Sequence, residues 1–124
     1  MSPGTLEQIL NSHAVELRFI RRRPLPGNDH RRMLATNDTN LLNSIPGRTA
    51  LNFHGAPGHL KFNPRQKGLV MTWDIFMQDF RLVPAESVEI VRAIRTTPPD
   101  EFWEYFNRVL SKMPEAQKVS FMHA

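Results

Sequence analysis

The sequence predicts a mainly β protein of the α+β class: a small five-stranded SH3-like or Sm-like barrel with a short N-terminal helix and two C-terminal helices. Short segments with alternating apolar residues recur between about residues 14 and 92, a tight polar corner precedes the last of them, and helical periodicity is confined to the two ends of the chain. We therefore expect a barrel over residues 1–95, with a long loop at 38–67, and a helical extension over 96–124 that packs on the barrel.

Length and composition narrow the classes of function. The chain has 124 residues and no cysteine, so we expect one modest core, and a disulfide framework, a thiolate metal site and a thiol nucleophile are excluded. No run of residues is apolar enough to span a membrane, and the N-terminal segment lacks the pattern of an export signal. We expect a soluble protein that stays in the cytoplasm and does not contact a membrane.

Positive charge is concentrated in the first half of the chain. The formal net charge is +4 and the pI is about 10.1. Between residues 18 and 67, ten Lys or Arg residues stand against only Asp29 and Asp38, whereas the two signs are nearly balanced in residues 98–124. Such a cluster favours a polyanionic partner, although charge alone bears on association and solubility and not on fold.

The N-terminal part predicts a short helix followed by a hairpin. Leu6 and Leu10 have helical spacing behind Thr5, the predicted cap. Alternating apolar residues from Val15 to Phe19 then indicate a strand. The segment "PLPGNDH" (24–30) is rich in turn-forming residues and "RRMLATN" (31–37) follows as the returning strand, so we expect a hairpin over about residues 14–37.

A second hairpin is predicted after the long loop at 38–67, in which Gly, Pro and Asn are frequent. Its strands lie at about 69–73 and 80–83 around the turn "DIFMQD", and "PAES" (84–87) forms a tight corner before a last strand. Inward-facing Trp73 and Phe80 would form a cross-strand aromatic contact. Asp74 would accept backbone N–H groups in the turn or pair with Arg81.

The C-terminal residues predict two helices. Thr97 is the expected cap of the first, and the next helix begins after Pro114, with Val119 and Met122 facing inward. The first helix carries an apolar stripe with Trp103 beside it, too apolar to remain in water; the stripe comprises Phe102, Phe106, Val109 and Leu110. The predicted structural core residues are Trp73, Phe80, Phe102 and Phe106.

Three segments resemble a family of small tailed-phage proteins described as having a WYL-type, Sm-like or SH3-like barrel. They are "VELRFIRRR", "RRMLATN" and "GLVMTWDIFMQDFRLVPAESVEIV", and together they cover roughly residues 14–92. The resemblance implies the barrel fold and a phage protein that acts in the host cytoplasm. The Trp-Tyr-Leu tripeptide that names the wider superfamily is absent, so the ligand-sensing roles of larger WYL-domain regulators are not carried over.

The predicted binding surface is the first hairpin. Guanidinium groups on both strands match phosphate oxygens, and aromatic residues from the loop would add stacking on bases. The alternative is a charged edge that prevents strand-to-strand aggregation. The predicted phosphate contacts are Arg21, Arg22, Arg23, Arg31, Arg32, Arg65 and Lys67, and the candidates for stacking are Phe53, His54 and Phe62.

Enzymatic chemistry is not expected. The chain has no nucleophile elbow, phosphate loop or paired carboxylates, and His54 and His59 lack a third metal ligand nearby. We expect no catalytic residue, metal or cofactor.

The hypothesis from the sequence is a non-enzymatic phage binding module for nucleic acid or a nucleic-acid-handling host protein. The alternatives are a homo-oligomeric sponge for a small anionic nucleotide and a virion or assembly component.

Overall fold

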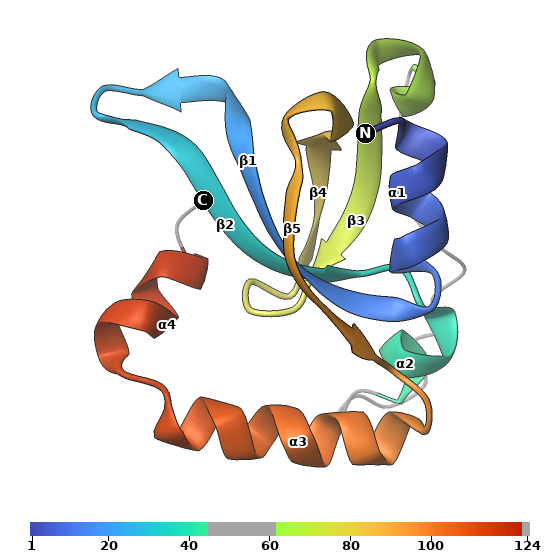
Figure 1. Ribbon diagram of the computed structural model, residues 1–124, viewed down its shortest axis with the longest axis vertical. Coiled ribbons are helices and arrows are strands. Elements are labelled where there is room, and N and C mark those ends of the chain that lie inside the picture. Colours follow the sequence, from blue (N-terminus) through green and yellow to red (C-terminus); the bar gives the residue numbers. More distant parts are fainter. Residues whose placement is uncertain (45–61, 123–124) are drawn as a thin grey trace.

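The computed structural model describes residues 1–44 and 62–122 and contains one five-stranded antiparallel sheet in the order β4-β3-β2-β1-β5 (Figure 1). This confirms the predicted α+β class with a dominant sheet. The strands are β1 (His13–Leu25), β2 (Asn28–Thr36), β3 (Leu69–Asp74), β4 (Asp79–Pro84) and β5 (Glu89–Arg95). The helices are α1 (Pro3–Leu10), α2 (Thr39–Asn43), α3 (Pro99–Lys112) and α4 (Glu115–Met122), with short 3-10 helices η1 (Pro64–Lys67) and η2 (Ala85–Ser87). No helix within these residues is long and apolar enough to cross a membrane.

Helix α1 is capped by Ser2. The sequence prediction of Thr5 as the cap is therefore wrong. The Ser2 hydroxyl accepts a hydrogen bond from the Thr5 backbone N–H at 3.2 Å, and Pro3 occupies the first turn, where a missing N–H costs nothing. Leu6 and Leu10 are fully buried beneath the helix. They pack into a core cluster on one side of the sheet, whose other members are Val15, Leu17, Phe19, Met33, Ala35, Val70, Val83 and Ala85.

The β1–β2 hairpin has a tighter turn than predicted. Strand β1 continues through Pro24 to Leu25, and the turn is confined to Pro26 and Gly27, whose φ of 74° suits glycine. Pairing with β2 is irregular between Ile20 and Leu25. This irregularity lets the strand accommodate Pro24, which has no N–H to donate to a regular ladder.

The two hairpins share only a short junction. Strand β2 pairs with β3 at Ala35↔Asp74 and Thr36↔Trp73, next to a backbone hydrogen bond from Ile75 to Leu34 at 2.9 Å. The rest of β2, toward the turn, has no β3 partner. The β1–β2 hairpin therefore projects beyond the junction as an arm, defined here as residues 18–32, that diverges from β3 and β4 (Figure 1).

A second core cluster joins the other side of the sheet to the C-terminal helices. Trp73 and Phe80 are register partners with their rings edge to face at 5.0 Å, which confirms the predicted contact. Trp73 and Phe102 are buried, whereas Phe80 and Phe106 are half-buried at the margin of the cluster. The buried members are Ala14, Leu34, Leu41, Leu42, Trp73, Ile75, Phe102, Trp103 and Phe121.

Two details of the C-terminal helices differ from the sequence predictions. Helix α3 is N-capped by Pro98, one residue after the predicted cap Thr97. In α4 the inward residue is Phe121, 3% exposed, while Val119 and Met122 are 43% and 51% exposed. Phe121 faces inward because its ring stacks on Phe76 at 4.6 Å and so buries more apolar area than either aliphatic side chain would.

The predicted loop at 38–67 contains regular structure at both of its described ends. Asp38 caps α2 by accepting hydrogen bonds from the backbone N–H groups of Asn40 and Leu41, and Leu41 and Leu42 are buried. Asn63 caps η1 in the same way. The predicted corner at residues 84–87 contains η2.

We expect Phe121→Ala to lower the free energy of unfolding by about 3–5 kcal/mol, since a buried aromatic ring is removed. Val119→Ala, on the exposed side of the same helix, should change it by no more than about 0.5 kcal/mol. Urea unfolding of both variants measures the difference. Equal effects would show that α4 does not dock through Phe121.

Candidate nucleic-acid interface

A cavity of about 440 Å³ lies between the arm and strand β4, and we name it the arginine groove. Its apolar floor consists of Phe19, Met33 and Leu82. Its remaining lining residues are all arginines: Arg21, Arg22 and Arg23 from β1, Arg31 from β2 and Arg81 from β4. Phe19 and Met33 are 6% and 1% exposed and belong to the first core cluster, so half-buried Leu82 provides most of the accessible apolar surface. This surface and the guanidinium groups around it can receive the face of a base and a phosphate.

The divergence of the two hairpins and the irregular end of β1 create this groove. In a regular strand, successive side chains point to opposite faces, so Arg21 and Arg22 would separate. The register shift between Ile20 and Leu25 interrupts this alternation, and consecutive arginines consequently line one cavity. Arg81 reaches the groove from β4, where its neighbour Phe80 faces Trp73 on the other side of the strand.

Among the described residues, the charged side chains that line the groove are all arginines, and ion pairs with Asp74 and Asp79 match two of them. Arg22 and Arg23 are exposed, and in the described part of the chain neither forms an ion pair, so the groove carries a net positive charge. Arg81 pairs with Asp79 at 2.6 Å at the surface, an interaction that solvent screens. The two exposed arginines are therefore the best-placed cations for an anionic ligand.

Arg31, a predicted phosphate contact, is instead buried in an ion pair. Its side chain is 4% exposed, and Nη2 donates to Asp74 Oδ2 at 2.8 Å. Its Nη1 donates to the Phe121 carbonyl at 3.1 Å and to the Arg32 carbonyl. Arg31 thus underlies the arginine groove as a structural cation and is not available to a ligand in this arrangement.

Burial dominates the ionisation of this pair. Removal from water raises the pKa of Asp74 above its usual range, although the Met77 backbone N–H and Arg31 act in the opposite direction. Burial likewise lowers the pKa of Arg31, with Asp74 opposing the shift. Asp74 also accepts the Met77 N–H at 3.1 Å, as predicted for the turn, but its cationic partner is Arg31 and not Arg81.

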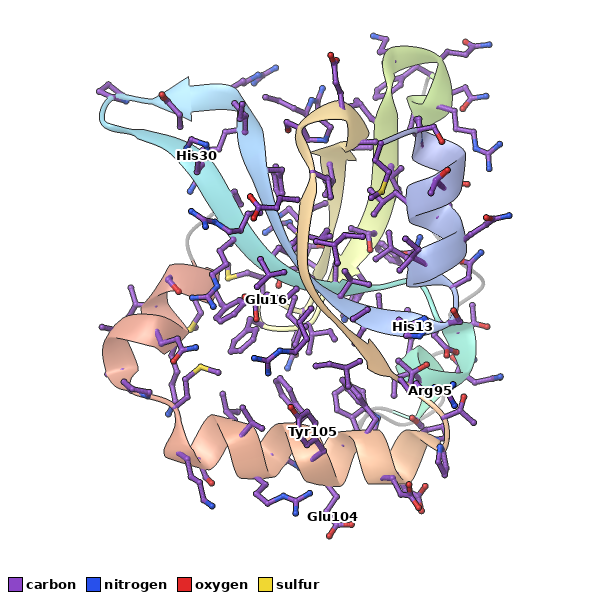
Figure 2. The ribbon with its side chains drawn as sticks, in the orientation of Figure 1. His13, Glu16, His30, Arg95, Glu104 and Tyr105 are labelled. Carbon is purple, nitrogen blue, oxygen red and sulfur yellow. The ribbon has the colours of Figure 1, made fainter. Side chains whose placement is uncertain are left out.

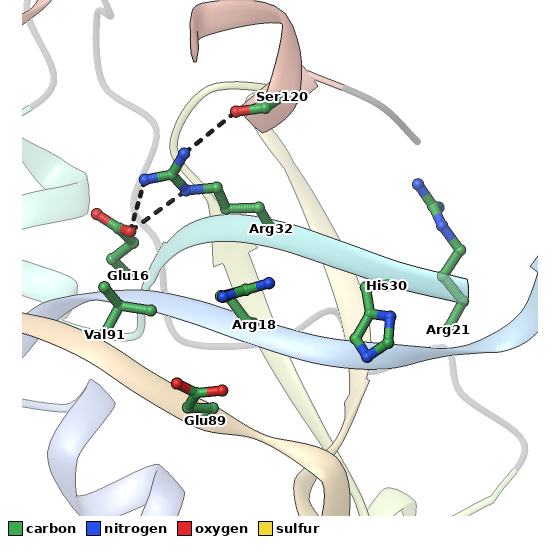
Figure 3. A pocket seen from close by; sticks show the side chains of 8 residues that line it. All are labelled: Glu16, Arg18, Arg21, His30, Arg32, Glu89, Val91 and Ser120. Carbon is green, nitrogen blue, oxygen red and sulfur yellow. Dashed lines mark hydrogen bonds and ion pairs between the residues drawn. The ribbon is translucent and has the colours of Figure 1, made fainter. Parts of the chain in front are cut away.

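Arg32 faces the opposite side of the arm from Arg31, as expected for neighbouring strand residues. It donates to Glu16 at 2.8 Å and 3.3 Å (Figure 3). Its guanidinium also lies 4.3 Å from the centre of the Phe121 ring. The adjoining cavity of about 570 Å³ is a second space, separate from the arginine groove. Figure 2 shows that His30, which lines it, lies nearer the end of the arm than Glu16.

The structure does not bring the remaining predicted contacts to the arginine groove. Arg65 pairs with Glu7 of α1, and Lys67 lies over the Phe62 ring at 4.6 Å. Neither cation lines the groove, and Phe62 is half-buried beside Lys67. The stacking candidates Phe53 and His54, and His59, lie outside the described residues.

Arg81 and Arg18 are candidate ligand contacts that the sequence prediction left out. Arg81 was considered only as a partner of Asp74, although alternation from Phe80 would have placed it on the opposite face of β4. Arg18 belongs to the basic cluster of residues 18–67 but is not among the predicted phosphate contacts. In residues 1–44 and 62–122 no cluster of three His, Asp or Glu residues could hold a metal ion.

Comparison with models of known protein families, with curated proteins and with solved structures finds no match for this chain.

Arg31→Met should lower the free energy of unfolding by about 3–5 kcal/mol because it leaves the Asp74 carboxylate buried without a cation. Adding Asp74→Asn should recover much of this loss, since the amide oxygen can still accept the Met77 N–H. Urea unfolding of the single and double variants gives the coupling. Arg22→Met is the exposed control, and a loss as small as that control would contradict a structural role for Arg31.

The raised pKa of Asp74 determines the direction in which this carboxyl group changes the free energy of unfolding with pH. The folded state keeps this proton to higher pH than the unfolded state, so this carboxyl contributes stability that is lost as pH rises from about 3.9 through the raised value. The free energy of unfolding of the wild type minus that of Asp74→Asn should therefore fall with increasing pH in this window. Urea unfolding at a series of pH values tests it, and an increase would contradict the assignment.

Proposed function

We propose that this protein is a non-enzymatic nucleic-acid-binding module that holds a single strand in the arginine groove. The observation that carries the proposal is the composition of this cavity, in which five arginines surround three apolar residues without a carboxylate. Guanidinium groups bind phosphate oxygens in a bidentate manner, and apolar surfaces accept the faces of bases. Arg22 and Arg23 contact phosphate, and Arg21 and Arg81 support them.

A single strand fits this groove better than a duplex. The cavity of about 440 Å³ lies within the range of pockets that enclose small ligands, so it accommodates roughly one nucleotide unit at a time. A duplex presents phosphates on its surface while its bases stay stacked inside. It would leave the apolar surface at half-buried Leu82 unused.

We also propose a barrel fold and a cellular location for this protein. A helix, five antiparallel strands and a 3-10 corner before the last strand support an SH3-like or Sm-like barrel, as does the packing of β1 against both β5 and β4. Barrels of this kind offer grooves for oligonucleotides, an argument by analogy of fold. The resemblance to the tailed-phage family makes the host cytoplasm the proposed location.

A second candidate function is capture of a small nucleotide, favoured by the size of the same cavity. The two functions differ in how affinity depends on ligand length. A free nucleotide fills the groove completely, so an added strand gains nothing. A nucleic acid ligand gains affinity with length because further phosphates reach the arm.

Replacing Arg22 and Arg23 together by Gln should weaken binding of a fluorescent oligo(dT) and flatten the plot of log affinity against log salt. Each lost phosphate contact on a single strand reduces the slope by about 0.7. Fluorescence anisotropy at a series of salt concentrations gives both quantities. Arg92 and Arg95 on β5 are also exposed, so their double replacement by Gln removes the same charge away from the groove.

A weaker effect of the β5 control supports the arginine groove as the site. An equal effect of the two double variants would show that only net charge matters. Weaker binding with an unchanged salt slope would show that Arg22 and Arg23 do not contact phosphate. Tight binding of a mononucleotide, with no gain for longer strands, would instead establish the nucleotide-capture function.

A further inference from the structure

The cavity on the opposite face of the arm combines positive and negative groups, unlike the arginine groove. It has a volume of about 570 Å³, lies over β5, β1 and β2, and is named here the mixed-charge cavity (Figure 3). Its cationic lining residues are Arg18, Arg21, Arg32 and, when protonated, His30, and its carboxylates are Glu16 and Glu89. Glu16 is accounted for by its ion pair with Arg32, so Glu89 is the carboxylate that could serve a ligand.

The charges in this cavity are not all neutralised within the protein. Arg18 lies in the middle strand, directly opposite Arg32 on β2 and Glu89 on β5. Glu16 neutralises Arg32 at 2.8 Å. Arg18 and Glu89 are both exposed, and neither takes part in an ion pair among the described residues. One guanidinium and one carboxylate therefore remain open to a ligand that offers both an anion and a hydrogen-bond donor.

The mixed-charge cavity is a separate space that meets the arginine groove at Arg21. Arg21 lines both spaces, so the boundary between them is the side chain of a cation that can contact phosphate on either side. Exposed Val91 adds an apolar surface to the second space. A strand that leaves the groove over Arg21 passes His30 and then meets Arg18, Glu89 and Val91 (Figure 3).

We propose that the mixed-charge cavity selects bases that carry an exocyclic amino group. Arg18 holds a phosphate of the strand, and the Glu89 carboxylate accepts a hydrogen bond from the amino group of the adjacent base, as carboxylates accept from the N4 amino group of cytosine. Thymine and uracil have no exocyclic amino group, and their N3–H is a poorer donor to Glu89 because the carbonyl oxygens on both sides of it repel the carboxylate. This inference rests on the proposed function and adds base preference to it.

The test compares oligo(dC) with oligo(dT) of equal length at slightly alkaline pH, where cytosine is not protonated. The wild type should bind oligo(dC) about tenfold more tightly, the ratio expected for one hydrogen bond to a charged acceptor. Glu89→Ala should reduce this ratio to within about twofold, while Glu89→Gln should retain part of it because the amide oxygen still accepts. The ratio is the readout because loss of a negative charge raises the affinity of both strands together.

Glu86→Ala is the matched control, since Glu86 is exposed in η2 and lines neither cavity. This variant should keep the wild-type ratio. Equal binding of the two oligonucleotides by the wild type, or an unchanged ratio in Glu89→Ala, would overturn the base preference while leaving strand binding in the groove intact. Failure of both oligonucleotides to bind would overturn the proposed function itself.

Discussion

The buried ion pair between Arg31 and Asp74 connects the arm, the β3–β4 turn and α4 through one pair of side chains. Asp74 ends β3 and accepts the Met77 N–H in the turn, while Arg31 lies on the arm and donates to the Phe121 carbonyl of α4. Two buried charges are tolerated only when their geometry is good and their other hydrogen-bonding groups are satisfied. The arm, the β3–β4 turn and α4 are therefore held in one mutually consistent arrangement, although β2 and β3 pair at only two positions.

This constraint divides neighbouring arginines into different roles. Arg31 and Arg32 both contact α4, one through the Phe121 carbonyl and the other through the Phe121 ring. Their charges are matched by Asp74 and Glu16. Arg22 and Arg23, in the irregular segment of β1 between Ile20 and Leu25, have no carboxylate partner among the described residues. A cluster that looks uniform in sequence thus contains paired, structural cations at its base and exposed cations near its end.

Much of the fold could be predicted from the sequence because local patterns determine it. Alternating apolar residues predict both hairpins, and the Trp73–Phe80 contact follows from their register. The burial of Arg31 could not be predicted, since it depends on a carboxylate 43 residues away and on a carbonyl 90 residues away. For the same reason the sequence favoured Val119 and Met122 over Phe121 as inward residues of α4: short helices lack a clear periodicity, and the aromatic partner Phe76 lies in a distant turn. Asp38, the cap of α2, was a local signal that was present but overlooked.

The central claim is that the exposed arginines of the arm bind phosphate while Arg31 remains with Asp74. The most direct measurement is a titration of the arginine side-chain N–H signals by NMR as a single-stranded oligonucleotide is added. The account predicts that the Nε–H signals of Arg22 and Arg23 shift and become protected from exchange with water, while those of Arg31 stay unchanged because its donors are already engaged. Shifts at Arg31 with unchanged signals from Arg22 and Arg23 would contradict it.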